Sequence, residues 1–309
     1  MHIPVGLSSK ICNISMNSLG VRILGKGFPM SPKSEETYRT FEKRIQETIM
    51  QHPIVLRNDY TQWFEKGALS LDEVRRFTVQ FSVFSNQFLI AQLKKMINAA
   101  TLEEMRASKE ILANEIGVIY QKRPSKKDGS GKSIGDIDEN TADPDLVGTE
   151  GSVDGGIFRF RAAHFEWLLY FAEPLGLAFE DMGKRKHGTE ATLHFMDELE
   201  RIYGSEDFND SIGASFAVEN WAAAGFWKEL INGLRIFKKS TLLKLHLGFF
   251  TWHDKVEAQH SEHTYDELKE IYYHDQFTED TFIAKGLEML DAVAVFWNGL
   301  NDDRKMHAA

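Results

Sequence analysis

Apolar residues recur along most of this chain at intervals of three and four, the spacing that gathers them on one face of an α-helix. The clearest run follows Ser70 and places Phe77, Phe81, Phe84 and Phe88 on a single helical face. No segment shows the sustained alternation of apolar and polar residues that a half-buried strand needs. The pattern therefore predicts an all-α protein without a β-sheet.

Helix starts are marked where a serine or threonine precedes a glutamate by three positions, because each side chain can cap the other residue's backbone N–H. This capping box occurs at Ser70, Thr101 and Thr264, and the last of these predicts a helix boundary just after His263. Together with the apolar periodicity, the boxes predict helices over residues 35–51, 54–66, 71–99, 102–120, 158–175, 189–203, 211–233, 239–263, 265–275 and 279–301.

Residues 121–156 differ in composition from the rest of the chain. They contain seven glycines, eight acidic and five basic residues, but few large apolar ones. A segment of this kind cannot bury enough apolar surface to fold by itself, so we expect a long polar insertion. We interpret residues 1–33 as an N-terminal extension and residues 34–309 as one helical domain, which is long enough to bury a sizeable core.

Charge and cysteine content narrow the class of protein. The 309 residues carry a formal net charge of -10, and the pI is near 5.6. Nucleic acid and anionic membranes both attract a basic surface, so the acidity argues against either as a partner. The only cysteine, Cys12, allows neither a disulfide nor a cysteine-based zinc site. No apolar run approaches the roughly 18 residues that span a bilayer, and we expect a soluble cytoplasmic protein.

A metal-binding face is indicated by His253, Glu257 and His260, which fall at positions i, i+4 and i+7 of an expected helix. Two imidazoles and one carboxylate projecting from about two helical turns suit a first-row transition metal such as iron. The same three residues on a solvated helix face would carry no chemistry. Donors from other helices are needed to decide between these interpretations.

Three further residues place a titratable side chain where the helical pattern favours an apolar one. Glu115, His164 and Glu219 each have apolar or aromatic neighbours three and four positions away. Burying such a group is costly unless it is paired or bound to a metal. The alternatives are a hydrogen-bonded core histidine and glutamates that form salt bridges at the edge of the core.

In chain order, these donors resemble the ligand set of the haem-oxygenase-like di-iron oxidases. That family places Glu, His, Glu and then His-x3-Asp/Glu-x2-His on core helices of a seven-helix bundle. The segments Asn114–Gly117 and Glu173–Leu177 also resemble stretches of the family. The resemblance covers roughly residues 40–300. It implies a single haem-oxygenase-like bundle of about seven core helices, with extra short helices and the polar insertion.

The resemblance implies two iron ions, or manganese in their place, with O2 as co-substrate. The implied metal ligands are Glu115, His164, Glu219, His253, Glu257 and His260. The chain departs from the family in two ways: the polar insertion separates the first two ligands by an unusual distance, and Glu257 stands where many members have Asp. Three carboxylates would offset most of the positive charge of two ferrous ions, as a buried site requires.

The implied activity is oxidation of a small metabolite by N-oxygenation, oxidative C–C cleavage, desaturation or decarboxylation of a fatty acid. Basic residues near the helices could pair with a substrate carboxylate, which favours an amino-acid-derived substrate. These residues are Arg159, Arg161, Lys228 and Arg235. An external reductant and a homodimer are further expectations from the resemblance.

Three other interpretations stay open. The same bundle could act without metal, as in thiaminase-like or cofactor-free relatives, although thiaminase-type chemistry needs a core cysteine and Cys12 lies outside the expected bundle. Haem binding would need one axial histidine, and His52 is the early candidate. A non-catalytic helical scaffold would bind a partner, take up no iron and consume no oxygen.

Overall fold

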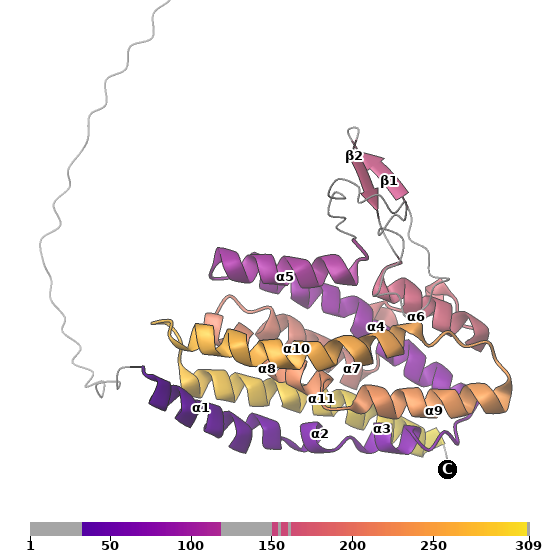
Figure 1. Ribbon diagram of the computed structural model, residues 1–309. Helices are drawn as coiled ribbons and strands as arrows, with labels where there is room; N and C mark the ends of the chain where they lie inside the picture. Colours follow the sequence, from indigo (N-terminus) through magenta and orange to yellow (C-terminus); the bar gives the residue numbers. More distant parts are fainter. Residues whose placement is uncertain (1–32, 119–149, 154–155, 160–161, 308–309) are drawn as a thin grey trace, which may run out of the picture. The chain divides into compact units, whose positions relative to one another are not determined.

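The apolar helix faces pack together in residues Ser34–Ala309, which form one compact unit. The structure is a computed structural model that describes residues 33–118, 150–153, 156–159 and 162–307 (Figure 1). Within these ranges it describes the backbone alone for residues 150–153, 156–159, 256–263 and 266. The expectations for the N-terminal extension, for Cys12 and for most of the polar insertion lie outside the described residues.

The described residues are almost entirely helical, which confirms the predicted all-α class. The α-helices are α1 (Glu35–Glu47), α2 (Pro53–Leu56), α3 (Asp59–Phe64), α4 (Leu71–Ile97), α5 (Leu102–Glu115), α6 (His164–Ala172), α7 (Glu190–Glu198), α8 (Phe208–Ala222), α9 (Phe226–Thr241), α10 (Gly248–Tyr272) and α11 (Glu279–His307). Short 3-10 turns cover Ile49–Gln51, Glu173–Leu175, Phe179–Asp181 and Arg185–His187, and a π-helical turn covers Leu199–Tyr203.

Two glycines let long helices approach closely. Helix α8 packs against both α10 and α11 (Figure 1). A Cβ at Gly213 of α8 would lie 2.5 Å from the carbonyl oxygen of Phe282 in α11, so the contact needs a residue without a side chain. Gly233 of α9 similarly faces the backbone of Phe64 in α3.

The aromatic stripe predicted on α4 forms the centre of the core. Phe77 and Phe81 are fully buried, and their rings are 5.2 Å apart between centroids. Phe81 also contacts Trp227 of α9, at 5.7 Å, and Phe250 of α10, at 6.1 Å. Edge and tilted contacts of this kind add to the free energy gained from burying the rings. The stripe therefore joins α4 to the helices that follow much later in the chain.

The capping boxes were partly confirmed. Ser70 caps α4 as predicted: the Glu73 amide donates to Ser70 Oγ at 3.2 Å, and the Ser70 amide donates to Glu73 Oε2 at 2.7 Å. Thr101 accepts from the Glu104 amide at 3.1 Å and begins α5. The boundary predicted at Thr264 is wrong, because α10 runs through it without a break. Thr264 is buried and accepts a hydrogen bond from Asn220 Nδ2 at 3.4 Å.

Other helix predictions were also wrong in their bounds. The helix expected over 211–233 is two helices, because Gly225 adopts a φ of 101° and turns the chain between α8 and α9. The helix expected from 239 begins instead at Gly248, after α9 has continued to Thr241. A single apolar periodicity cannot reveal a turn when the residues on both sides of it are buried.

A short hairpin departs from the expectation that the chain lacks a sheet. Strand β1 (Glu150–Val153) pairs antiparallel with β2 (Gly156–Arg159), with Glu150 opposite Arg159. Helix α6 consequently starts at His164 and not at the expected residue 158. The two strands carry no apolar alternation long enough to be recognised in the sequence.

None of the helices in the described part of the chain is both long enough and apolar enough to cross a membrane.

The α3–α9 contact yields a stability prediction. Replacing Gly233 with alanine should lower the free energy of unfolding by about 1–3 kcal/mol, because the added methyl group would overlap the Phe64 backbone. Urea denaturation followed by circular dichroism measures the change. Lys239→Ala, at an exposed position of the same helix, is the matched control and should stay within about 0.5 kcal/mol of the parent. Equal midpoints for the two variants would contradict the close contact.

Candidate metal centre

Three of the predicted ligands lie at or near helix ends. Glu115 is the last residue of α5, and Gly117, with a φ of 74°, turns the chain directly after it. His164 is the first residue of α6, whose start is fixed by Glu166: the Ala163 amide donates to Glu166 Oε2 at 2.6 Å. His253 lies in the second turn of α10. Local capping thus positions two of the three side chains.

The structure brings Glu115, His164 and His253 together. Glu115 Oε2 and His164 Nδ1 are 2.8 Å apart, and one donor atom from each of the three residues lies within 4.8 Å of the others. The side chains of His164 and Glu115 are 3% and 17% exposed, and His253 is 8% exposed. The only group of this kind in the described part of the chain is therefore largely shielded from water.

These separations suit a shared metal ion. Nitrogen and oxygen ligands lie about 2.0–2.2 Å from such an ion, so neighbouring donors are about 3 Å apart and opposite donors about 4.2 Å apart. The 2.8 Å between Glu115 and His164 matches a neighbouring pair, and the outer limit of 4.8 Å needs only a small contraction. A carboxylate with two imidazoles is also the donor chemistry that iron, manganese or zinc accepts.

The tautomer of His253 follows from its backbone contact. Its Nδ1 lies 2.6 Å from the carbonyl oxygen of Phe249, one turn earlier in α10. A carbonyl oxygen can only accept, so Nδ1 carries the proton and the lone pair of the neutral ring is on Nε2. Ligating histidines are commonly oriented by a hydrogen bond of this kind, which leaves the other ring nitrogen to bind the metal.

Aromatic rings enclose the two histidines. His164 lies 4.4 Å from Trp252 and 5.4 Å from Trp167, and His253 stacks on Trp227 with centroids 4.8 Å apart. All three tryptophans are buried. Such walls exclude water and strengthen every electrostatic interaction between them. The indole N–H groups of Trp167 and Trp227 are buried and meet no hydrogen-bond acceptor among the described residues.

Glu219 lies outside the three-residue group, but its negative charge and that of Glu115 act on the same buried tyrosine, Tyr203. Burial raises the pKa of Tyr203 well above its usual range, and the negative charges of Glu219 and Glu115 raise it further. Burial also lowers the pKa of Lys95, while the charge of Glu219 opposes that shift. The carboxylates from α8 and α5 thus act on the same buried tyrosine.

The sequence analysis did not single out Lys95 or Tyr203 as functional residues, although the position of Lys95 could have indicated it. It lies 18 residues after Phe77, about five helical turns, and so shares the face of the aromatic stripe. Its Nζ donates to Ser215 Oγ and lies 4.7 Å above the Tyr203 ring. A lysine on an apolar stripe could have been recognised by the same rule that singled out Glu115.

A buried hydrogen-bond chain fixes the helix that carries Glu115. The Tyr203 hydroxyl donates to Gln92 Oε1 at 2.5 Å, and Gln92 Nε2 donates to the Ser108 carbonyl of α5 at 2.9 Å. Gln92 and Ser108 are both buried. These two hydrogen bonds link the π-helical turn, α4 and α5. They hold α5 in place and so help to position Glu115 at its end.

The remaining two predicted ligands stay predictions. Glu257 and His260 lie on α10, one and two turns after His253, but their side chains are outside the described residues. The helix is unbroken between His253 and His260, so the expected i, i+4, i+7 relation holds for the backbone.

Sequence comparison finds no match to a known protein family or to a curated protein. Comparison with solved structures finds similar folds. A CADD-like protein of unknown function from Nostoc punctiforme has a TM-score of 0.55 at 16% identity, over 87% of this chain and 98% of that one. A domain of unknown function with a heme oxygenase-like fold from Shewanella denitrificans has a TM-score of 0.53 at 14% identity, over 89% and 94%.

A TenA homolog from Pseudomonas syringae has a TM-score of 0.51 at 9% identity, over 85% of this chain and 92% of that one. Identities this low establish the fold alone. The chain therefore has a haem-oxygenase-like fold, as the sequence predicted. Its activity has to be argued from its own residues.

The buried tyrosine yields a pH-dependent prediction. Tyr203→Phe should lower the free energy of unfolding by about 1–3 kcal/mol near neutral pH, because Gln92 Oε1 loses its donor. The pKa of Tyr203 is raised in the folded state, so its stabilising contribution is complete below the unfolded pKa of about 10 and is lost as pH rises above it. The difference between parent and variant should therefore shrink in alkaline solution.

Urea denaturation at about pH 7 and about pH 11 measures this difference. Gln92→Leu is the companion variant, and in combination with Tyr203→Phe it should cost less than the sum of the two single changes. A difference that is the same at both pH values would contradict the burial of the phenol.

Proposed function

We propose that the protein is a non-haem di-iron oxidase or oxygenase that uses O2 to oxidise a small metabolite. The observation that carries the proposal is the buried convergence of Glu115, His164 and His253 from three different helices. A carboxylate and two imidazoles at ligand separation, inside aromatic walls, are costly to bury without a bound cation.

The proposal assigns further donors to a second ion. Glu219 would contribute from α8, with Glu257 and His260 from α10, as the resemblance of the six residues to the haem-oxygenase-like di-iron oxidases implies. Three carboxylates and three neutral imidazoles leave a near balance against two divalent ions, which a site of low dielectric requires. Manganese would meet the same donors, and iron is the ion that we propose.

A bound pair of ferrous ions would supply two electrons to dioxygen. The chain's own residues do the rest. The backbone contact to Phe249 orients His253, the tryptophan walls exclude water, and the chain from Tyr203 to Ser108 holds α5 in place. An external reductant would restore the ferrous state, and an amino-acid-derived substrate is the class that we favour.

The similar solved structures have different descriptions, so the fold does not identify the function. The donor residues have to distinguish a metal-dependent enzyme from a metal-free one. A metal-free enzyme could bury His164 against Glu115 as a hydrogen-bonded pair. It would have no need for His253 at ligand distance from both. The third donor is what supports a metal centre over the metal-free alternative.

Anaerobic titration with Fe(II) tests the proposal. The protein should bind about two equivalents, and tryptophan fluorescence should fall during the titration, because Trp227 and Trp252 lie beside the histidines. His253→Ala and Glu219→Ala should weaken uptake at least about 100-fold, since each removes a ligand and not merely a neighbour of one. Circular dichroism checks that the variants remain helical.

The matched control is His246→Ala, a histidine close to the start of the same helix but outside the three-residue group. It should bind iron like the parent. No binding by the parent, or unchanged titrations of His253→Ala and Glu219→Ala, would refute the proposed centre.

A further inference from the structure

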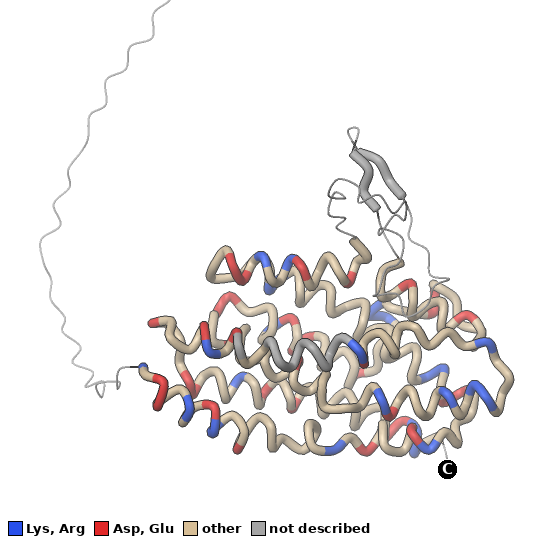
Figure 2. The backbone as a smooth tube through the Cα atoms, in the orientation of Figure 1, with Lys and Arg blue, Asp and Glu red and all other residues tan. Residues whose placement is uncertain are grey.

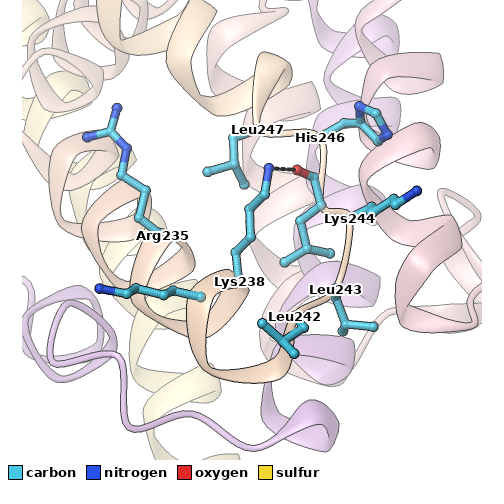
Figure 3. Close-up of a pocket in the computed structure, with 9 residues that line it drawn as sticks. Arg235, Lys238, Leu242, Leu243, Lys244, His246 and Leu247 are labelled. Atoms are coloured by element: carbon cyan, nitrogen blue, oxygen red, sulfur yellow. Dashed lines mark hydrogen bonds between the residues drawn. The ribbon is translucent and has the colours of Figure 1, made fainter.

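The chain between α9 and α10 forms a basic turn at the end of the bundle. Here an open depression of about 780 Å³ is lined by several cationic and apolar residues. The basic turn is defined by Arg235, Lys238, Lys239, Leu242, Lys244 and His246 (Figure 3). It is a surface feature separate from the three-residue metal group.

The charge of the basic turn contrasts with the rest of the molecule. The protein has a net charge of -10, yet residues 230–247 contain no acidic residue. Figure 2 shows Lys and Arg gathered along α9 and the chain that follows it. Arg235, Lys239 and Lys244 are exposed and form no ion pair with any described residue.

Several cations elsewhere on the surface are paired within the molecule. Arg44 pairs with two carboxylates of α11, and Arg76 and Arg201 also contact two carboxylates each. The basic turn differs in that three exposed cations without an ion pair to a described residue lie together in it. Unpaired charges of this kind steer an oppositely charged partner.

A side-chain-to-backbone hydrogen bond ties the turn to α9. Lys238 Nζ donates to the carbonyl oxygen of Leu245 at 2.6 Å, which fastens the turn to α9 (Figure 3). Leu242 adopts a φ of 58°, which a branched side chain rarely does, and is 87% exposed. Arg235 and Lys244 point away from the turn on opposite sides (Figure 3). A tip of this kind presents an apolar side chain between cations.

The basic turn adjoins both helices that carry the histidines of the candidate centre. Leu247 is six residues before His253, a distance of about 9 Å along α10. The His246 ring lies 4.1 Å from the ring of Tyr170, which is six residues after His164 in α6. Rigid helical connections and an aromatic contact therefore lead from this surface to the centre.

We infer that the basic turn docks a small acidic electron-carrier protein of the ferredoxin or flavodoxin class. The inference rests on the proposed function, which needs an external reductant. Each docking event would move one electron: the carrier is oxidised by one electron and one ferric ion is reduced to ferrous, with no transfer of atoms. Charge complementarity and the short path to the ligand-bearing helices both favour this partner.

The size of the surface also fits a carrier. A stable protein interface takes about 20–30 residues on each side, whereas transient electron-transfer contacts are among the smallest known. The few residues of the basic turn match the smaller class. An anionic membrane is a poorer fit, because burying the largely exposed Leu242 side chain would supply only about 2 kcal/mol, and stable anchoring needs considerably more.

Direct binding to an oxidised plant-type ferredoxin tests the docking surface without any metal in the enzyme. The parent should bind with an affinity that falls as salt is raised. Arg235→Glu, Lys239→Glu and Lys244→Glu in combination should weaken binding at least about tenfold. The matched control combines Lys43→Glu, Arg106→Glu and Lys109→Glu, which change the net charge equally on α1 and α5, and it should bind like the parent.

A second measurement separates this inference from the proposed function. Iron-loaded, oxidised protein is reduced anaerobically either with dithionite or with reduced ferredoxin. The triple variant should match the parent with dithionite and be at least about tenfold slower with ferredoxin. If the parent takes up no iron, the proposed function and the electron-carrier role both fail, while the binding comparison still reports on docking.

Equal binding of ferredoxin by the parent and the triple variant would overturn the inference. So would binding of the parent to phosphatidylcholine vesicles that contain phosphatidylserine, without binding to ferredoxin. A change of oligomeric state in the triple variant, with ferredoxin binding unaltered, would show that the basic turn joins copies of this chain.

Discussion

The contact between Glu115 and His164 is the constraint on which the arrangement of the candidate metal centre depends. Their donor atoms lie 2.8 Å apart in a region where the histidine is almost wholly buried. Removing one member of a buried pair leaves the other uncompensated, at a cost of about 3–5 kcal/mol. The pair joins the end of α5 to the start of α6, and so fixes the two helices that flank the polar insertion. His253 then makes the pair into a three-donor group.

Helix α4 connects α5, which carries Glu115, to the rest of the bundle. Its aromatic stripe contacts α9 and α10 through Phe81, and Gln92 near its C-terminal end holds α5 through the Ser108 carbonyl. Lys95 continues the stripe beside Tyr203. One helix therefore supplies the apolar centre and, a few turns later, the polar groups around the carboxylates. The haem-oxygenase-like fold gives these groups a rigid support, while the chemistry depends on the side chains that this chain places there.

The features predictable from the sequence were those with a local physical signal. Helical periodicity indicated the fold class, a titratable residue on an apolar face singled out Glu115 and His164, and the i, i+4, i+7 spacing singled out His253. The break at Gly225 and the continuous helix through Thr264 were missed, because a buried turn keeps the apolar pattern and a buried threonine can hydrogen-bond to another helix. Tyr203 gave no signal, because an interior tyrosine is ordinary until its hydroxyl is seen to bond to Gln92.

We propose that these donors, with those of Glu219, Glu257 and His260, hold two metal ions. The most direct measurement is anomalous diffraction at the iron absorption edge from crystals grown anaerobically with Fe(II). We expect two peaks, one of them about 2.0–2.2 Å from Glu115 Oε2 and from one ring nitrogen each of His164 and His253. Iron bound only at surface carboxylates, with Glu115 and His164 still in direct contact, would contradict it.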